Sequence, residues 1–382
     1  MEKRVVIVDF NHMVHTLYYS QHRLSIRVTE NGEVRDKDTT IQNGAIKAVH
    51  RWSNHGFNPM AICFDRPVPA RKAFWQSAFT DMQVGTSGEY KGGREKMTDT
   101  MFEGISDCER ILRGAGVSCF AEPNFEADDL VFACVQRAKE KYPGMPIDVI
   151  TNDADLLPLV DDTVSVFLRS KKGTYAESKE LEKLHYVQVT PRNYQSVVEG
   201  LSAYKGFYMP YNSLLLHKLL RGDSSDGFCR KDIKKKFPAG KWNKLMEALI
   251  ADSINFEEIF RYGKPTYRLL YKGTDEVFPG TFEEALNSPD KAKLYQKVGN
   301  SEELDVILEV LEEYTDLTKE QLESIEKTYW GMNLNQTYPN PDKMLARREY
   351  ELAKNGHGDI DVFKESELQR IVSPLQIRLS TV

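Results

Sequence analysis

The first half of the chain alternates short runs of consecutive apolar residues with longer stretches in which apolar residues recur every three or four positions. Short runs of this kind are typical of buried strands, and the longer spacing is typical of amphipathic helices. The expected strands cover residues 5–9, 59–65, 117–121, 146–151 and 163–168. The expected helices cover residues 12–22, 41–52, 98–114, 126–141 and 156–160. Strands that alternate with helices predict an α/β fold, with a mainly parallel central sheet flanked by helices.

Residues 23–37 differ, because polar and apolar residues alternate there on both sides of Asn31-Gly32, which is a signal for a β-hairpin. From about Pro191 the pattern becomes mostly helical. The helices expected in this second half cover residues 214–221, 241–251, 301–314, 319–329 and 343–355. We therefore expect three parts, covering residues 1–190, 191–300 and 301–382.

Composition is that of a globular protein, with 41% hydrophobic residues, 28% charged residues and a mean hydropathy of -0.50 over 382 residues. No apolar run approaches the ~20 residues that a membrane helix needs. The chain begins with a strand-like run at residues 5–8 and shows no signal-peptide layout, so we expect a cytoplasmic protein without a membrane partner. The five cysteines are scattered and form no Cys-x-x-Cys pair, which favours reduced thiols over a zinc site.

Charge is unevenly distributed along the chain, whose net charge is -6. Residues 301–330 contain ten acidic and two basic residues, a local charge of -8, so the rest of the chain carries about +2. Residues 218–244 contain nine basic and three acidic residues, a local charge of +6. Segregated basic surface favours a polyanionic partner more than the net charge disfavours one.

Carboxylates follow several of the expected strands. Asp9 and Asp65 end two of them, three acidic residues lie within 126–129, and Asp153 and Asp155 follow another strand. Any one of these side chains alone is as well explained as a helix cap or turn residue. Together they would repel one another unless a cation compensates them, and hard divalent cations take oxygen ligands. We therefore expect a metal site beyond the carboxyl ends of the strands.

Two further segments contain residue types that are suited to binding nucleic acid. Residues 66–96 mix cations with aromatic side chains and glycines, and cations can neutralise phosphates while aromatic rings stack on unpaired bases. An ordinary surface helix and loop would explain this segment equally well. The helix that ends at Gly222 is followed by Asp223, Asp226 and the basic run at residues 230–236. A solvated helix face is the alternative for those lysines.

Taken together, the chain resembles the 5′ nucleases, which comprise flap endonucleases, the 5′-nuclease domains of bacterial replicative-repair polymerases, and phage 5′→3′ exonuclease and ribonuclease H enzymes, with a PIN-like fold. The matching pieces occur in family order over roughly residues 4–230. They are Val8-Asp9-Phe10-Asn11, Phe64-Asp65, Tyr90-Lys91-Gly92-Gly93-Arg94, Glu126-Ala127-Asp128-Asp129, Asp153-Ala154-Asp155 and Gly222-Asp223-Ser224-Ser225-Asp226.

The resemblance implies a carboxylate cluster that holds two Mg²⁺ ions, for which Mn²⁺ can substitute. The residues implied for the first ion are Asp9, Asp65, Glu126 and Asp128. Those implied for the second are Asp129, Asp153, Asp155, Asp223 and Asp226. Two ions ~3.5–4 Å apart can activate a water and stabilise the leaving oxygen of a phosphodiester.

The resemblance also implies a helical gateway at about residues 66–98 and a helical duplex-binding region at 191–300. In the gateway, Lys91 and Arg94 would stabilise charge on the scissile phosphate and Tyr90 would stack on the terminal base. The DNA-binding residues expected are Arg66, Arg71, Lys72, Trp75, Lys96, Arg230, Lys231, Lys234, Lys235 and Lys236. Many relatives follow the Gly-Asp-x-x-Asp motif with a glycine-rich hairpin, whereas Gly227-Phe228-Cys229-Arg230-Lys231 follows here, so the duplex grip is expected to rely on the lysine run.

The function expected is therefore metal-dependent 5′→3′ exonuclease and flap endonuclease activity on 5′ flaps, nicks, free 5′ ends and RNA-DNA hybrids. A PIN-type RNA nuclease and a non-catalytic DNA-binding replisome protein are the alternatives. The basic helical region disfavours the first, and the complete acidic set disfavours the second. We expect a monomer, in a bacterial host if the chain is phage-encoded. Residues 301–382 form an acidic helical extension, which either contacts a replisome protein or packs on the nuclease core.

Overall fold

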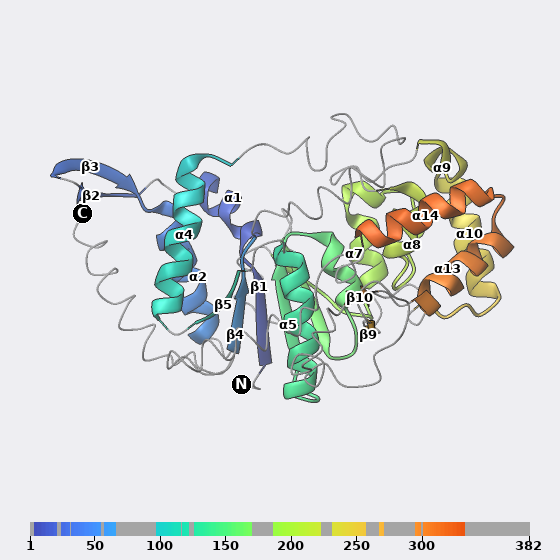
Figure 1. Cartoon of the computed structure of the whole chain (residues 1–382), viewed down its shortest axis with the longest axis horizontal. Helices are drawn as coiled ribbons and strands as arrows, with labels where there is room; N and C mark the ends of the chain where they lie inside the picture. The colour runs from blue at the N-terminus through green and yellow to red at the C-terminus, as the bar shows by residue number, and fades with distance from the viewer. Residues whose placement is uncertain are drawn as a thin grey trace. The chain divides into compact units, whose positions relative to one another are not determined.

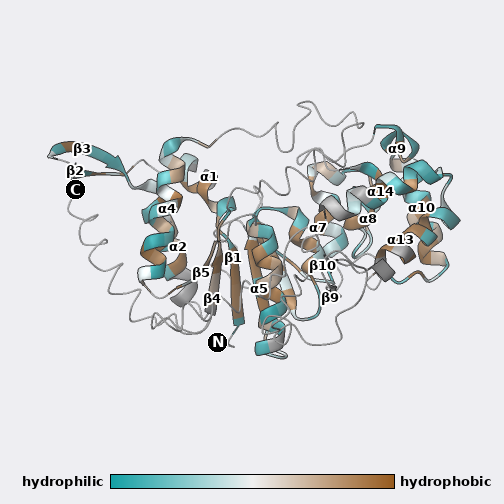
Figure 2. Cartoon of the chain, in the orientation of Figure 1, coloured by the Kyte–Doolittle hydropathy of each residue, from teal (hydrophilic) through white to brown (hydrophobic). Residues whose placement is uncertain are grey.

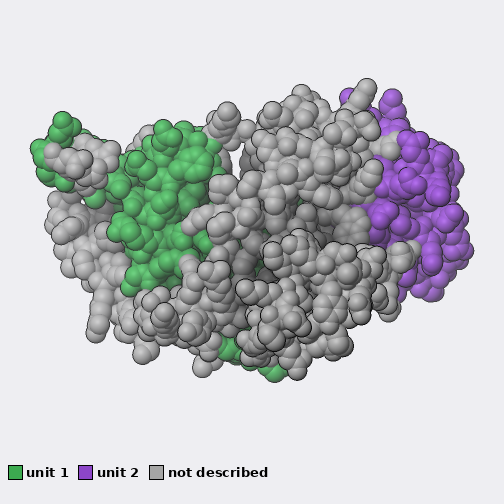
Figure 3. All heavy atoms as spheres, viewed as in Figure 1, with its two compact units in different colours: residues 1–68, 95–193, 344–382 green, residues 69–94, 194–343 purple. Residues whose placement is uncertain are grey.

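The computed structural model describes residues 4–20, 24–30, 32–54, 57–65, 97–115, 117–121, 126–169, 186–222, 231–256, 267–270, 295–298 and 301–332. The described elements form two compact units, of which the first ends at Asn193 and the second begins at Tyr194 (Figure 3). The three-part division expected from the sequence stays a prediction.

A six-stranded sheet is the centre of the first unit, with the strand order β5-β4-β1-β6-β7-β8. The first five strands run parallel to their neighbours, and β8 runs antiparallel to β7. Their bounds are β1 Arg4–Asp9, β4 Phe57–Cys63, β5 Ser118–Phe120, β6 Ile147–Thr151, β7 Val164–Arg169 and β8 Tyr186–Val189. The mainly parallel sheet is thus confirmed. The sequence analysis missed β8, because the polar Gln188 interrupts its short apolar run.

Helices cover both faces of this sheet (Figures 1 and 2). Val6 and Val8 of β1 lie in one apolar cluster with residues of α1, α2 and α4. Val5 and Ile7 point to the opposite face because side chains alternate along a strand, and they are equally buried where α5 packs on β1. The helices are α1 Asn11–Ser20, α2 Thr40–Asn54, α4 Asp99–Gly114 and α5 Ala127–Lys141, all close to their expected bounds.

The expected hairpin is also present, with β2 at Ser25–Glu30 paired antiparallel to β3 at Glu33–Asp38. Gly32 in its turn has φ +84°, a conformation that glycine adopts without steric cost. The short helix expected at residues 156–160 is a 3-10 helix, η1, at Ala154–Leu159. Pro158 lies inside it and cannot donate a backbone hydrogen bond, which fits a short helix with few such bonds.

The second unit is mainly helical, as expected. Its helices are α7 Tyr194–Gly200, the 3-10 helix η2 Ser202–Tyr204, α8 Leu214–Arg221, α9 Lys231–Lys236, α10 Ala239–Ala251, α13 Ser301–Tyr314 and α14 Lys319–Met332. Gly222 ends α8 with φ +74°, as its position in the sequence predicts. An antiparallel strand pair, β9 at Tyr267–Leu270 and β10 at Tyr295–Val298, was not predicted. The expected helix at residues 343–355 lies outside the described residues.

No helix among the described residues combines the length and the apolar character needed to span a bilayer. The four described cysteines, Cys63, Cys108, Cys119 and Cys134, are buried free thiols.

Candidate metal centre

Seven carboxylates lie at the carboxyl ends of four neighbouring parallel strands, β5, β4, β1 and β6, or in the turns that follow them. Asp9 is the last residue of β1 and pairs with Cys63, the last residue of β4. Asp65 comes two residues later. The sequence predicts this edge as the site because parallel strands present the same ends together.

Asp9 is a buried carboxylate in a setting that disfavours its charge. It is 4% exposed, and Thr151 Oγ1 donates to Asp9 Oδ2 at 2.8 Å. Burial and the negative charges of Asp65 and Asp153 together raise the pKa of Asp9 to about 7, although the hydrogen bond from Thr151 lowers it. The folded chain therefore holds like charges close to one buried carboxyl, where a cation would relieve the repulsion.

Asp65 ties three elements together. Asn11 Nδ2 donates to Asp65 Oδ2 at 2.7 Å, and the Ala127 backbone N–H donates to Asp65 Oδ1 at 2.6 Å. The Asp65 backbone N–H also donates to Asn11 Oδ1 at 3.3 Å. Asp65 thus connects the start of α1 with the N-terminus of α5, whose first N–H groups have no carbonyl partner within the helix and favour an anion.

Asn11 and Thr151 are site residues that the sequence analysis did not assign. Asn11 was noted only as the residue after the first strand, and Thr151 only as the end of another. Their partners lie 54 and 142 residues away, so local pattern gives no sign of either contact.

The acidic group at the start of α5 is arranged around a helix cap. Glu126 precedes the helix as its N-cap residue, rather than lying in its first turn as expected. The Glu126 backbone N–H donates to Asp129 Oδ2 at 3.0 Å, which is one half of a capping box. Glu126 and Asp129 are buried, whereas Asp128 is half-buried. Glu126 and Asp129 thus lie next to each other, and their assignment to different ions stays a prediction.

Asp153 and Asp155 lie at the start of η1. Asp153 is the N-cap residue, and its Oδ1 accepts the Asp155 backbone N–H at 2.9 Å. The Asp153 N–H in turn donates to Thr151 Oγ1 at 3.0 Å. Thr151 therefore links this turn to Asp9, so that the ends of β1 and β6 are held by one hydroxyl.

His12 is a neutral neighbour of the site. His12 Nδ1 donates to the Asp9 carbonyl oxygen, which leaves Nε2 to accept from the Tyr186 hydroxyl of β8 at 3.0 Å. Burial lowers the pKa of His12 to about 4, so the ring is uncharged at neutral pH. These contacts make His12 a support for the Asp9 backbone and for β8.

The donor set fits a hard divalent cation in its chemistry, since it consists of carboxylate oxygens that repel one another. Within the described ranges, however, no three or more His, Cys, Asp or Glu side chains converge closely enough to hold an ion. Both oxygens of Asp65 already accept hydrogen bonds.

The remaining expected site residues divide between two groups. The basic run includes the described helix α9, in which Lys231 and Lys235 are exposed and Lys234 and Lys236 are half-buried. The others lie outside the described residues: Arg66, Arg71, Lys72, Trp75, Tyr90, Lys91, Arg94, Lys96, Asp223, Asp226 and Arg230.

Known proteins resemble the first unit. DNA polymerase I of Mycobacterium bovis is 33% identical over 148 residues, which cover 37% of this chain and 16% of that protein. The 5′-3′ exonuclease of Buchnera aphidicola subsp. Schizaphis graminum is 25% identical over 183 residues, which cover 48% of this chain and 57% of that protein. The chain thus spans less than two thirds of either relative. Among solved structures, the T5 D15 protein co-crystallised with metal ions aligns with a TM-score of 0.48 and 12% identity, covering 92% of this chain and 99% of that one.

The sequence model that matches this chain is described as the 5′-3′ exonuclease N-terminal resolvase-like domain, and it covers residues 4–185. That range contains the whole carboxylate edge of the sheet. This segment, just under half of the chain, is thus similar to the 5′-3′ exonuclease family.

Proposed function

We propose that this chain is a divalent-metal-dependent 5′→3′ exonuclease and flap endonuclease. The observation that carries the proposal is the buried Asp9, whose pKa is raised by burial and by Asp65 and Asp153 at the strand ends. This concentration of like charge lies within the segment that matches the 5′-3′ exonuclease domain. A stable fold has no use for such repulsion, whereas a cation site requires it.

Two Mg²⁺ ions, or Mn²⁺ in their place, would supply an activated water and a stabilised leaving oxygen when bound. Asp9, Asp65, Glu126 and Asp128 would hold one ion, and Asp129, Asp153, Asp155, Asp223 and Asp226 would surround the other. Asn11 and Thr151 would fix the Asp65 and Asp9 carboxylates, since each donates to one of their oxygens. Lys91 and Arg94 would neutralise the scissile phosphate, and Tyr90 would stack on the terminal base.

The substrates proposed are 5′ flaps, nicks and free 5′ ends of DNA, together with RNA-DNA hybrids such as primers. The lysines of α9 and the cations of residues 66–96 would bind the phosphate backbone. We further propose a cytoplasmic monomer that works in replication or recombination, with the C-terminal extension as a contact for a replisome protein.

The test is hydrolysis of a 5′-labelled flap and a nicked duplex in Mg²⁺, with wild type compared against Asp155→Asn. The Asp155 backbone makes the bond to Asp153, so the substitution removes a carboxylate and spares the turn. We expect cleavage to fall by more than about 100-fold, beyond the loss typical of residues that only orient a ligand. Asp162→Asn is the matched control, because Asp162 is an exposed carboxylate in the next turn.

Undiminished cleavage by Asp155→Asn would refute the site assignment. Preference for RNA over a DNA flap in competition would instead favour the PIN-type RNA nuclease. Absence of Mg²⁺ and Mn²⁺ binding in calorimetry, together with retained DNA binding, would favour the non-catalytic protein.

A further inference from the structure

Helix α9 and the residue that follows it, Phe237, contain three pairs of residues four positions apart, each pair on a different face. Ile233 and Phe237 are buried. Lys231 and Lys235 are exposed. The remaining pair is Asp232 and Lys236, and both of these side chains contact the α13–α14 hairpin, which comprises residues 301–332. Residues four apart lie on one side of a helix. The helix geometry therefore places the lysines of the basic run on different sides, although they are neighbours in the sequence.

A helix of six residues that carries four lysines does not hold its own orientation. Isolated helices shorter than ~12 residues are marginal in water, and like charges at helical spacing repel one another. The direction in which α9 points its exposed lysines is therefore set by contacts from other elements.

One such contact comes from α8. Arg221 Nη1 donates to the Lys234 carbonyl oxygen at 3.0 Å and to the Phe237 carbonyl oxygen at 2.9 Å. These carbonyls lie at the C-terminal end of α9, where a cation is favoured, and the Lys234 oxygen also accepts the Phe237 backbone N–H at 3.3 Å. The Arg221 guanidinium also lies 4.9 Å from the centre of the Phe207 ring, which fixes its own position.

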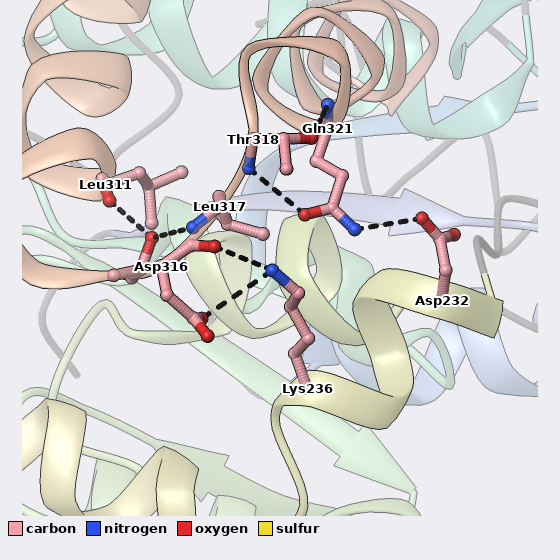
Figure 4. Close-up of polar contacts among 8 residues, drawn as sticks. Asp232, Lys236, Leu311, Asp316, Leu317, Thr318 and Gln321 are labelled. Atoms are coloured by element: carbon pink, nitrogen blue, oxygen red, sulfur yellow. Dashed lines mark hydrogen bonds and ion pairs between the residues drawn. The ribbon is translucent and has the colours of Figure 1, made fainter.

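The second contact comes from the turn between α13 and α14 (Figure 4). Lys236 Nζ donates to the Asp316 carbonyl oxygen at 2.6 Å and lies 3.7 Å from Asp316 Oδ1. Gln321 Nε2 donates to Asp232 Oδ2 at 3.0 Å, while Gln321 Oε1 accepts the Thr318 backbone N–H at 3.1 Å. Figure 4 shows the two side chains of α9 reaching toward this turn from one side of the helix.

The hairpin that supplies the second contact is itself well packed. Ile307 and Leu311 of α13 and Ile325 and Tyr329 of α14 are almost completely buried, and α14 packs against α8. Thr315 Oγ1 donates to the Leu311 carbonyl oxygen and accepts the Leu317 N–H at 3.4 Å, which bridges the turn. Both supports of α9 therefore rest on α8.

We propose that the α13–α14 hairpin is a positioning element, which uses Asp316 and Gln321 to hold α9 so that Lys231 and Lys235 face the phosphate backbone of duplex DNA. Lys236 then serves the fold rather than the DNA. This inference rests on the proposed function, because it assumes that α9 binds duplex DNA. It gives residues 301–332 a role in substrate binding, where the sequence analysis left a partner contact or simple packing as the alternatives.

The experiment measures binding of a fluorescent nicked duplex in EDTA, which prevents hydrolysis, over a range of salt concentrations. Asp316→Asn removes a negative charge next to the lysines, so simple electrostatics predicts tighter binding. Loss of positioning predicts the opposite. Lys236 keeps its bond to the Asp316 carbonyl oxygen and loses only the ion pair at 3.7 Å, so we expect affinity to fall by about 2- to 5-fold, the size of an exposed ion pair. Gln321→Ala should weaken binding similarly without changing any charge.

Three further variants complete the test. Lys235→Gln should lower the slope of log affinity against log salt by about 0.9, the value for one lost phosphate contact. Asp316→Glu keeps a carboxylate and should bind within about twofold of wild type, since either length can reach Lys236. Glu312→Gln is the matched control: Glu312 is exposed on α13, and losing its charge should leave affinity unchanged or slightly raised.

Tighter binding and a steeper salt slope for Asp316→Asn would overturn the inference, because they would mean that Asp316 withholds Lys236 from phosphate. An unchanged slope for Lys235→Gln would equally overturn it. If either result occurred in a variant that still cleaves flaps at the wild-type rate, the proposed function would stand. Wild-type protein that shows neither salt-dependent duplex binding nor cleavage would instead refute the proposed function.

Discussion

Asp9→Asn should make the metal-free protein more stable at alkaline pH. The carboxyl has a pKa of about 7 in the folded chain and 3.8 as its ordinary value. The folded state therefore binds more protons than the unfolded state between these values, and stability falls as pH rises from about 4 to about 7. When Asp9 is fully ionised, it lowers the free energy of unfolding by ~4 kcal/mol, since each pKa unit corresponds to 1.36 kcal/mol.

An asparagine can still accept from Thr151 through its Oδ1, so the substitution removes the charge and keeps this bond. Burying the amide has a cost of its own, which does not depend on pH. The useful quantity is therefore the difference between the two proteins at two pH values. From pH 5 to pH 8 the stability of Asp9→Asn relative to wild type should rise by roughly 2–3 kcal/mol.

The assay is urea unfolding in EDTA at pH 5 and pH 8, followed by circular dichroism. His12 titrates in both proteins: its lowered pKa makes stability fall as pH drops from about 6.5 toward 4, and this effect cancels in the comparison. Adding Mg²⁺ should stabilise wild type and leave Asp9→Asn unchanged, because a cation bound to the native state adds stability by mass action.

Asp148→Asn is the matched control, since Asp148 is equally buried but forms an ion pair with Arg4 at 3.2 Å. Removing this paired carboxylate should destabilise the protein at pH 8, the opposite sign to Asp9→Asn. If Asp9→Asn gained no stability relative to wild type between pH 5 and pH 8, the repulsion at the strand ends would be too small to require a cation.

Two other substitutions test the packing around the site. Tyr186→Phe should lower the free energy of unfolding by about 1 kcal/mol, because it removes the donor to the buried His12 Nε2; equal stability in urea would mean that this bond contributes nothing. Gly104→Ala should destabilise by about 1–3 kcal/mol, since the new Cβ would lie 2.8 Å from Ile41 Cδ1 and 3.1 Å from Ile41 Cβ. Ile41→Val should recover part of this loss, and Gly114→Ala, where no atom lies within 4 Å, should lose nothing.

The apolar runs and helical spacing of the sequence were sufficient to predict the sheet, because burial on both faces leaves a local pattern that can be read directly. Strand-end carboxylates at Asp9, Asp65 and Asp153 were equally visible, since parallel strands bring their carboxyl ends to one edge. The strands β8, β9 and β10 were missed because a polar residue interrupts each short apolar run: Gln188 in β8, Arg268 in β9 and Gln296 in β10.

Contacts between distant residues were decided only by the tertiary structure. The bonds of Asn11 to Asp65 and of Thr151 to Asp9 depend on strands that meet side by side. The raised pKa of Asp9 depends on the same arrangement, because it comes from burial and from the nearby Asp65 and Asp153. The basic run read as one patch in the sequence, but the fold separates the exposed Lys231 and Lys235 from Lys236, whose partner Asp316 lies 80 residues away. Local periodicity reports on neighbours within a turn or a strand, so it carries no information about such partners.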